Sequence, residues 1–150
     1  MIEEMDDRQI DEVLLSQTVG RIGCHADSLT YVVPVTYVYD NNGIHGHLDQ
    51  GLKVRLMRAN PKVCFEVEQI EDISHWKTVI AWGTFLELSG DEAEKARILL
   101  SRRLSHLIKS NTADLSLDRA SYVDYRLHTL GSHGTMYRIE ITKKTGRLER

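Results

Sequence analysis

The sequence predicts a mainly β protein, a six-stranded antiparallel barrel with flanking helices. Runs rich in β-branched and aromatic residues recur along the chain, and short turn-forming segments separate them. Closing such a sheet into a barrel removes its exposed strand edges. With 150 residues and 41% hydrophobic content, the chain can bury one sizeable core but is too short to suggest two, so residues 1–150 are predicted to form a single domain.

The first element is predicted to be a short amphipathic helix over residues 6–17, ending near Gly20. Asp6 or Asp7 can serve as its N-cap. Its apolar residues recur at mostly helical spacing: Ile10, Val13, Leu14 and Leu15.

Three strands are predicted next, over residues 20–25, 31–39 and 44–47. A polar break at residues 26–28 separates the first two, and the turn Asn41-Asn42-Gly43 separates the second from the third. Pro34 interrupts the second run. Because proline cannot donate a ladder hydrogen bond, it indicates an edge or an irregularity where an outside group can meet the backbone.

The remaining chain predicts two helices and three strands. A short helix over residues 52–59 stops before Asn60-Pro61, and a long helix follows Asp91, with apolar residues recurring at three- and four-residue spacing up to Leu104. The strands cover residues 62–69, 77–88 and 136–142, with a bulge or close backbone approach expected at Gly83. The segment Lys109 to Asp118 is expected to be irregular and suggests no chemistry.

Composition excludes several classes of function. A net charge of -3 lacks the positive field of proteins that bind nucleic acid through its phosphates. No segment approaches the roughly 20 apolar residues that cross a bilayer, and the acidic N-terminus does not resemble a signal peptide. Cys24 and Cys64 lie in strand-like runs and are read as buried thiols in a reducing compartment, so a cytoplasmic protein is predicted.

The segment from His45 to Lys53 is the strongest candidate for a binding site. A histidine at a strand end, a loop containing Gly51 and a lysine at a helix start could surround a phosphate with N–H groups and an ammonium. Lys53 would carry the charge, with Arg55 and Arg58 as further candidates. On spacing alone, a solvated loop with a surface lysine is the more frequent arrangement.

Other chemistry has weaker support in the sequence. His45 and His47 share one strand face, but no third and fourth ligand appears at a convincing spacing, so no metal site is predicted. No G-x-S-x-G motif is present, and neither cysteine has an obvious base beside it. Trp76 and Trp82 could stack on a planar ligand, although packing in a core or interface is the more frequent role of tryptophan.

Five motifs in order resemble the pyridoxamine 5'-phosphate oxidase-like FMN-binding split-barrel superfamily, and within it the nitroimidazole-reductase-like branch. They extend over most of the chain: Gly20-Arg21-Ile22-Gly23, Tyr31-Val32-Val33-Pro34-Val35-Thr36-Tyr37, His47-x-x-x-Gly51-x-Lys53 with Asn60-Pro61-x-Val63-Cys64-Phe65, Trp76 to Gly83, and Met136 to Thr142 with Thr145-Gly146-Arg147. The sequence departs from the family at Leu48, where serine or threonine is common.

The resemblance implies a homodimer with FMN in two grooves between the protomers. The strand Pro34-Val35-Thr36-Tyr37 would lie against the isoalloxazine ring and offer it backbone groups. His47 and Leu48 would line the flavin, and Lys53 would hold the 5'-phosphate. The strand from Trp76 to Trp82 would cover the ring of the partner protomer.

Three functions remain open at this point. The first is an FMN-dependent oxidoreductase that passes electrons from NAD(P)H to a small electrophilic acceptor such as a nitro-aromatic compound. The second is a flavin or haem carrier or sensor, in which His45 or His47 would be an axial iron ligand. The third is a dimeric module without a cofactor. No set of basic residues for a pyridoxamine phosphate substrate is apparent, so that oxidase activity is not predicted.

Overall fold

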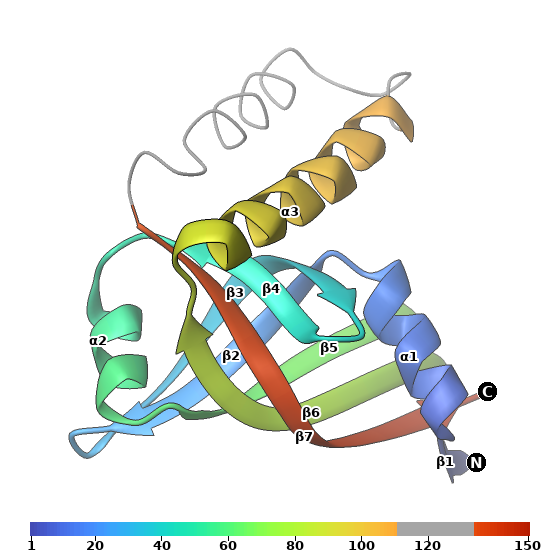
Figure 1. The fold of residues 1–150 in the computed structure, drawn as a ribbon. Helices are drawn as coiled ribbons and strands as arrows, with labels where there is room; N and C mark the ends of the chain where they lie inside the picture. Colours follow the sequence, from blue (N-terminus) through green and yellow to red (C-terminus); the bar gives the residue numbers. More distant parts are fainter. Residues whose placement is uncertain (111–133) are drawn as a thin grey trace.

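A computed structural model describes residues 1–110 and 134–150 of the chain (Figure 1). Seven strands and three helices are present in these residues. In chain order they are β1 (Ile2–Glu4), α1 (Asp7–Ser16), β2 (Val19–Ala26), β3 (Leu29–Asp40), β4 (Gly43–Leu48), α2 (Leu52–Ala59), β5 (Lys62–Asp72), β6 (His75–Glu87), α3 (Gly90–Ser110) and β7 (Thr135–Glu149).

Six of the strands form a closed antiparallel ring. The sheet runs β7-β4-β3-β2-β5-β6, and a further pairing of β6 with β7 closes it. β1 adds to β7 beside the C-terminus, so the two ends of the chain lie close together (Figure 1). The six-stranded antiparallel barrel predicted from the sequence is therefore confirmed, and β1 is an addition that the sequence did not reveal.

Two of the hairpin turns follow from their residues. Asp27 and Ser28 join β2 to β3 with φ of 51° and 62°, the positive values that a tight two-residue hairpin turn requires. In the predicted turn Asn41-Asn42-Gly43, the positive φ belongs to Gly43, at 124°. The side chain of Asp40 accepts a hydrogen bond from the Asn42 amide at 2.9 Å, as in an Asx turn.

The interior of the barrel holds the main hydrophobic core. Tyr37 and Phe65 pack edge to face with their ring centroids 4.8 Å apart, and both side chains are fully buried. The Tyr37 hydroxyl donates a 2.7 Å hydrogen bond to the Leu14 carbonyl, which fixes α1 over one end of the barrel. α2 contributes Val54 and Met57 to the same core.

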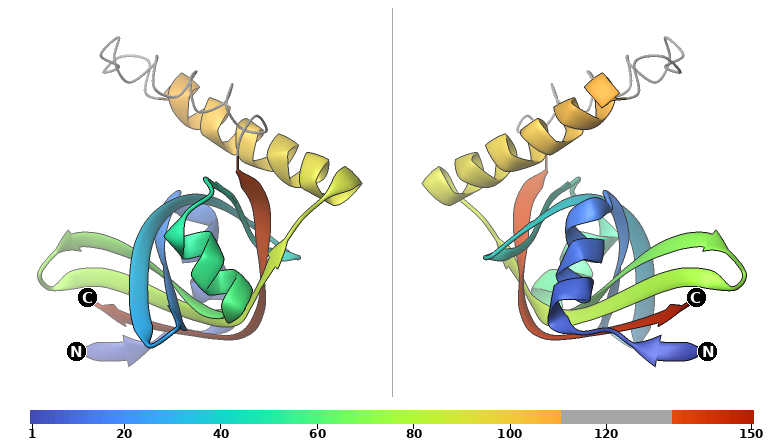
Figure 2. Two further views of the ribbon diagram at one scale, coloured as in Figure 1. Left: turned by 90° about the vertical axis from the view of Figure 1, so that its left-hand side faces the viewer. Right: turned by 90° about the vertical axis from the view of Figure 1, so that its right-hand side faces the viewer.

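The long helix α3 covers part of the outer surface of the barrel (Figures 1 and 2). Its small residues Ala93 and Ala96, together with Leu100, pack on Val38 of β3 and Met136 of β7. This second cluster is separate from the barrel interior. It explains why Val38 is buried although it points outward.

Several predicted boundaries need correction. α1 ends at Ser16, before Gly20, and Leu15 is 55% exposed and does not belong to its buried face. β7 continues to Glu149, well past the predicted end at residue 142. Lys109 and Ser110 belong to α3 and are not irregular, whereas residues 111–118 of that predicted segment lie outside the described residues.

The irregularity expected at Gly83 is present, but the extra residue lies on the neighbouring strand. Trp82 pairs with Lys143 and Gly83 with Ile141, which leaves Thr142 of β7 as the bulged residue. A Cβ atom at position 83 would lie 2.1 Å from the Glu140 carbonyl oxygen, so the close backbone approach is confirmed.

Candidate functional site

An open strand edge on β3 is the first component of the candidate site. β3 pairs with β4 only from Tyr37 to Asp40, while its first half pairs with β2 alone. The Tyr37 amide donates to the Thr18 carbonyl at 2.9 Å, on the β2 side. Because backbone groups alternate in direction along a strand, those of Val32 and Pro34 face the opposite edge. No described strand pairs with that edge at Val32 and Pro34, so these backbone groups are available to a ligand.

The predicted run from Pro34 to Tyr37 therefore divides into two kinds of residue. Pro34 and Thr36 are exposed on the outer surface, and their backbone groups point away from β2. The side chains of Val35 and Tyr37 are buried in the core. The missing N–H of Pro34 costs no ladder hydrogen bond because it falls at the open edge, as the sequence predicted.

The N-terminus of α2 is the second component of the candidate site. In the chain, α2 begins shortly after the end of β4, the strand that pairs with β3. Gly51 is the N-cap residue and provides no side-chain hydrogen bond, and the first turn holds no acidic residue. The first amides of a helix have no intrahelical partners, and the helix dipole adds partial positive charge there. The half-buried Lys53 lies in this first turn, so the arrangement suits an anion such as a phosphate.

The two further phosphate candidates differ in their availability. Arg58 donates to both carboxylate oxygens of Glu87, with Nε 3.0 Å from each. These hydrogen bonds lower the pKa of Glu87. Arg58 is therefore engaged in an ion pair, while the Arg55 side chain is exposed and has no carboxylate partner among the described residues.

The histidines and Leu48 lie on β4, next to the open edge. His47 is half-buried on the outer surface, whereas the Leu48 side chain is buried in the core, so only its backbone can contact a ligand. His45 is also buried, and its Nε2 lies 2.7 Å from Oδ1 of Asp40. Among residues 1–110 and 134–150, no three His, Cys, Asp or Glu side chains gather where they could hold a metal ion.

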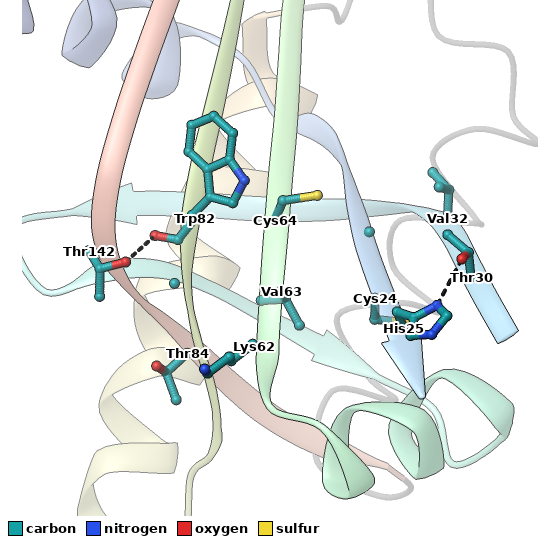
Figure 3. Close-up of a pocket in the computed structure, with 12 residues that line it drawn as sticks. Cys24, His25, Thr30, Val32, Lys62, Val63, Cys64, Trp82, Thr84 and Thr142 are labelled. Atoms are coloured by element: carbon teal, nitrogen blue, oxygen red, sulfur yellow. Dashed lines mark hydrogen bonds between the residues drawn. The ribbon is translucent and has the colours of Figure 1, made fainter. Parts of the chain in front are cut away.

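A groove of about 550 Å³ is the third component, and it lies over β2, β3, β5 and β6 (Figure 3). Four residues on neighbouring strands cross it in one row. The strand register places Val32 opposite Gly23, Gly23 opposite Cys64, and Cys64 opposite Trp82. Because Gly23 has no side chain, the Cys64 sulfur can lie close to its backbone. Gly23 and Cys64 form the floor of the row, and Val32 and Trp82 form walls at its two ends.

The groove includes only one of the predicted site residues, Trp82. Its indole is 38% exposed, and the Lys143 ammonium lies 5.3 Å from the ring centroid. Trp76 is on the same strand face but six residues away, about 20 Å along the strand. Its indole N–H donates to Glu149 at 3.0 Å. The two tryptophans of one protomer therefore lie too far apart to stack on the same ring system.

The other lining residues were missed by sequence reasoning. Lys62 and His25 bring basic groups to the groove, and Thr30 bonds to His25 with 2.8 Å between Oγ1 and Nδ1. Cys64 is half-buried in the groove, and Cys24 is buried, which raises the pKa of its thiol. The only sequence feature that could have indicated this groove is Gly23, a glycine inside a predicted strand. Its role depends on which residues face it on the neighbouring strands, and the sequence does not specify that register.

Comparison with known proteins identifies the family. The model of the pyridoxamine 5'-phosphate oxidase family matches residues 6–148. The chain belongs to this family. The resemblance drawn from the sequence motifs is thereby confirmed.

Solved structures share the fold over the whole chain. A FAD-binding protein from Mesorhizobium loti is 26% identical with a TM-score of 0.73, covering 100% of this chain and 99% of that one. A 5-nitroimidazole antibiotic resistance protein from Bacteroides thetaiotaomicron is 16% identical with a TM-score of 0.70, covering 99% and 87%. A haem storage protein from Vibrio cholerae is 12% identical with a TM-score of 0.62, covering 91% and 90%. The last two likenesses concern the fold alone.

A curated relative from Rhizobium meliloti, an uncharacterised protein, is 29% identical over 87 residues. The match covers 58% of this chain and 58% of that protein. In the described part of the chain, no helix is long and apolar enough to span a membrane.

Proposed function

We propose that the protein is a cytoplasmic, homodimeric FMN-dependent oxidoreductase that takes electrons from NAD(P)H and passes them to a small electrophilic acceptor of the nitro-aromatic type. The observation that carries this proposal is the open β3 edge together with the uncapped N-terminus of α2, which follows β4, the strand paired with β3. It supplies backbone groups for a planar polar ring and an anion site for a phosphate, the two ends that an FMN molecule presents.

The residues of the chain fit these roles. The Val32 amide and carbonyl and the Pro34 carbonyl would bind the polar edge of the ring, since no described strand pairs with them. The ammonium of Lys53 and the first amides of α2 would hold the phosphate. His47 would lie beside the ring. The bound flavin would supply the redox chemistry, while the protein orients it and shapes its surroundings.

Comparison with solved structures supports a flavin at this site. The Mesorhizobium loti structure, described as a FAD-binding protein, aligns over the whole chain at 26% identity, and a FAD-binding protein from Mycobacterium smegmatis has a TM-score of 0.63 at 18% identity. FMN is proposed rather than FAD because FMN ends in a phosphate, and the N-terminus of α2 offers an anion site that this terminal phosphate can occupy.

Exposed apolar side chains support the homodimer. Val19 is 56% exposed, Ile70 is 64% exposed and Ile73 is 92% exposed. The two isoleucines lie at the tip of the β5–β6 hairpin, which projects away from the barrel in Figure 2. A second copy of the chain would remove this surface from water, and β6 of each protomer would then face the flavin of the other.

A haem-binding carrier is the second candidate, because the haem storage protein from Vibrio cholerae shares the fold. Of the two histidines that the sequence suggested as axial ligands, His45 is buried with its Nε2 bonded to Asp40. The haem hypothesis therefore depends on His47.

The visible spectrum of the purified full-length protein separates these functions. A flavin doublet supports the proposal, a Soret band supports the haem carrier, and a protein that stays colourless after incubation with FMN contradicts the flavin proposal. Mixing the yellow protein anaerobically with NADH and then NADPH tests the catalytic part. Bleaching of the flavin followed by reoxidation with a nitro-aromatic compound is expected, whereas a flavin that stays oxidised would indicate a carrier.

A further inference from the structure

We propose that the groove over β2, β3, β5 and β6 binds a planar aromatic anion, such as an aryl carboxylate. The inference rests on the lining of the groove and holds whether or not a flavin binds at the β3 edge. If the proposed dimer forms, the groove lies on the β6 surface that faces the flavin of the other protomer, so its ligand would be held next to that ring.

The shape of the groove fits a flat ligand. Trp82 and Val32 stand at the two ends of the row that crosses it, and both are exposed, at 38% and 62%. Gly23 forms the floor between Val32 and Cys64, which face it in the strand register. A volume of about 550 Å³ lies within the range of small-molecule sites. An aromatic ring could therefore lie over Gly23 and contact the exposed indole of Trp82.

The charge of the groove favours an anion. Lys62 and His25 line it, and among residues 1–110 and 134–150 no aspartate or glutamate does. Among the described residues, no carboxylate pairs with the Lys62 ammonium. Lys143 adds a second ammonium over the indole of Trp82. An anionic ligand would gain electrostatic complementarity here that a neutral or cationic ligand would not.

On a neighbouring part of the same surface, a basic side chain is paired with carboxylates. Arg21 lies one row away on β2, and its guanidinium is 3.2 Å from Glu66 and 3.3 Å from Glu68. That basic group is neutralised within the protein, whereas Lys62 is not. The hydroxyl of Thr84 lines the groove and can donate a further hydrogen bond to a carboxylate, while that of Thr30 is already bonded to His25.

Isothermal titration calorimetry of the full-length chain with 2-naphthoate tests the proposal, and 2-naphthalenemethanol serves as the neutral twin. We expect one site per chain and at least about tenfold weaker binding of the alcohol, a difference of about 1.4 kcal/mol. The chain has two tryptophans, so a Trp76→Phe variant assigns their indole N–H resonances. The Trp82 resonance should shift on binding while that of Trp76 stays in place.

Variants then test the individual contacts. Lys62→Gln should weaken 2-naphthoate about fivefold and reduce the salt dependence of binding, while Lys62→Arg should retain it. Lys77→Gln removes the same charge from an exposed position of β6 outside the groove and should change nothing. Equal affinity for acid and alcohol, or no effect of Lys62→Gln, would overturn the proposal.

Two competition experiments can also overturn it. Saturating FMN should leave the affinity for 2-naphthoate within about twofold, since mutual displacement would mean that the groove is part of the flavin site. Sedimentation velocity should show the same oligomeric state with and without 2-naphthoate. Dissociation of a dimer by the ligand would mean that a second copy of the chain occupies the groove.

Discussion

Gly23 lies directly opposite Cys64 across the β2–β5 pair, and a Cβ atom at position 23 would lie 2.7 Å from the Cys64 sulfur. Gly23→Ala should therefore destabilise the protein by about 1–2 kcal/mol, because the thiol must rotate or the strands must separate. In a Cys64→Ala background the contact is absent, and the same change should cost at least about 0.5 kcal/mol less. Urea unfolding of the four proteins measures this coupling, and equal costs in both backgrounds would contradict it.

Arg103 connects α3 to the C-terminus of α1. Its guanidinium donates to the carbonyls of Leu15 and Ser16, at 3.2 and 3.1 Å, which are among the last carbonyls of α1 and have no partner within that helix. Arg103→Gln should lower the free energy of unfolding by about 1 kcal/mol. Arg102→Gln removes the same charge at the neighbouring exposed position and should have little effect. Similar losses in the two variants would show that net charge is responsible.

Asp11 makes the stability dependent on pH. Its Oδ1 accepts hydrogen bonds from Lys144 at 2.7 Å and from Tyr39 at 2.8 Å, which join α1 to β7 and β3. Burial raises the pKa of the Asp11 carboxyl, but the bonds from Lys144 and Tyr39 outweigh it, so its pKa lies below the ordinary value. Such a group stabilises the fold above its unfolded-state pKa, near about 4, and loses this contribution as the pH falls through the folded-state pKa.

Asp11→Asn should therefore be less stable than the wild type at pH 7, by up to about 1 kcal/mol for a pair that is partly exposed. The difference should shrink as the pH falls below about 4. Urea midpoints between pH 3 and 7 measure it. Glu12→Gln on the same helix, where the partner Arg8 is 3.9 Å away, is the matched control and should show a smaller difference. If the stability difference between the wild type and Asp11→Asn stays constant with pH, the Asp11 carboxylate is not the source of that difference.

The barrel could be predicted because its strands carry local signals. Pro34 indicated the open edge, and the turn at residues 41–43 fixed the β3–β4 hairpin. β1 could not be predicted, since Ile2-Glu3-Glu4 offers a single apolar residue and pairs only because β7 is already in place. The second half of β7 was missed for a similar reason. Its sequence from Lys143 to Gly146 is mostly polar, and its pairing with β6 keeps it extended.

The candidate site could be predicted only where it lies on one continuous segment. The segment from His45 to Lys53 was proposed because its strand, loop and helix follow one another along the chain, and the family resemblance favoured a binding role over a solvated loop. Residues of five strands, β2, β3, β5, β6 and β7, line the groove. Its floor depends on Gly23 facing Cys64, and the strand register decides which residues face each other. The sequence also could not show that Arg58 is held by Glu87, because the two residues are far apart in the chain.

Equilibrium dialysis of the full-length protein against FMN tests the central claim most directly. Wild type, Lys53→Ala and Lys95→Ala are compared, the last removing the same charge from an exposed position of α3. We predict one FMN per chain, about tenfold weaker binding by Lys53→Ala and unchanged binding by Lys95→Ala. Wild-type protein that retains no FMN would contradict flavin binding, and FMN bound equally well by Lys53→Ala would contradict the phosphate site at α2.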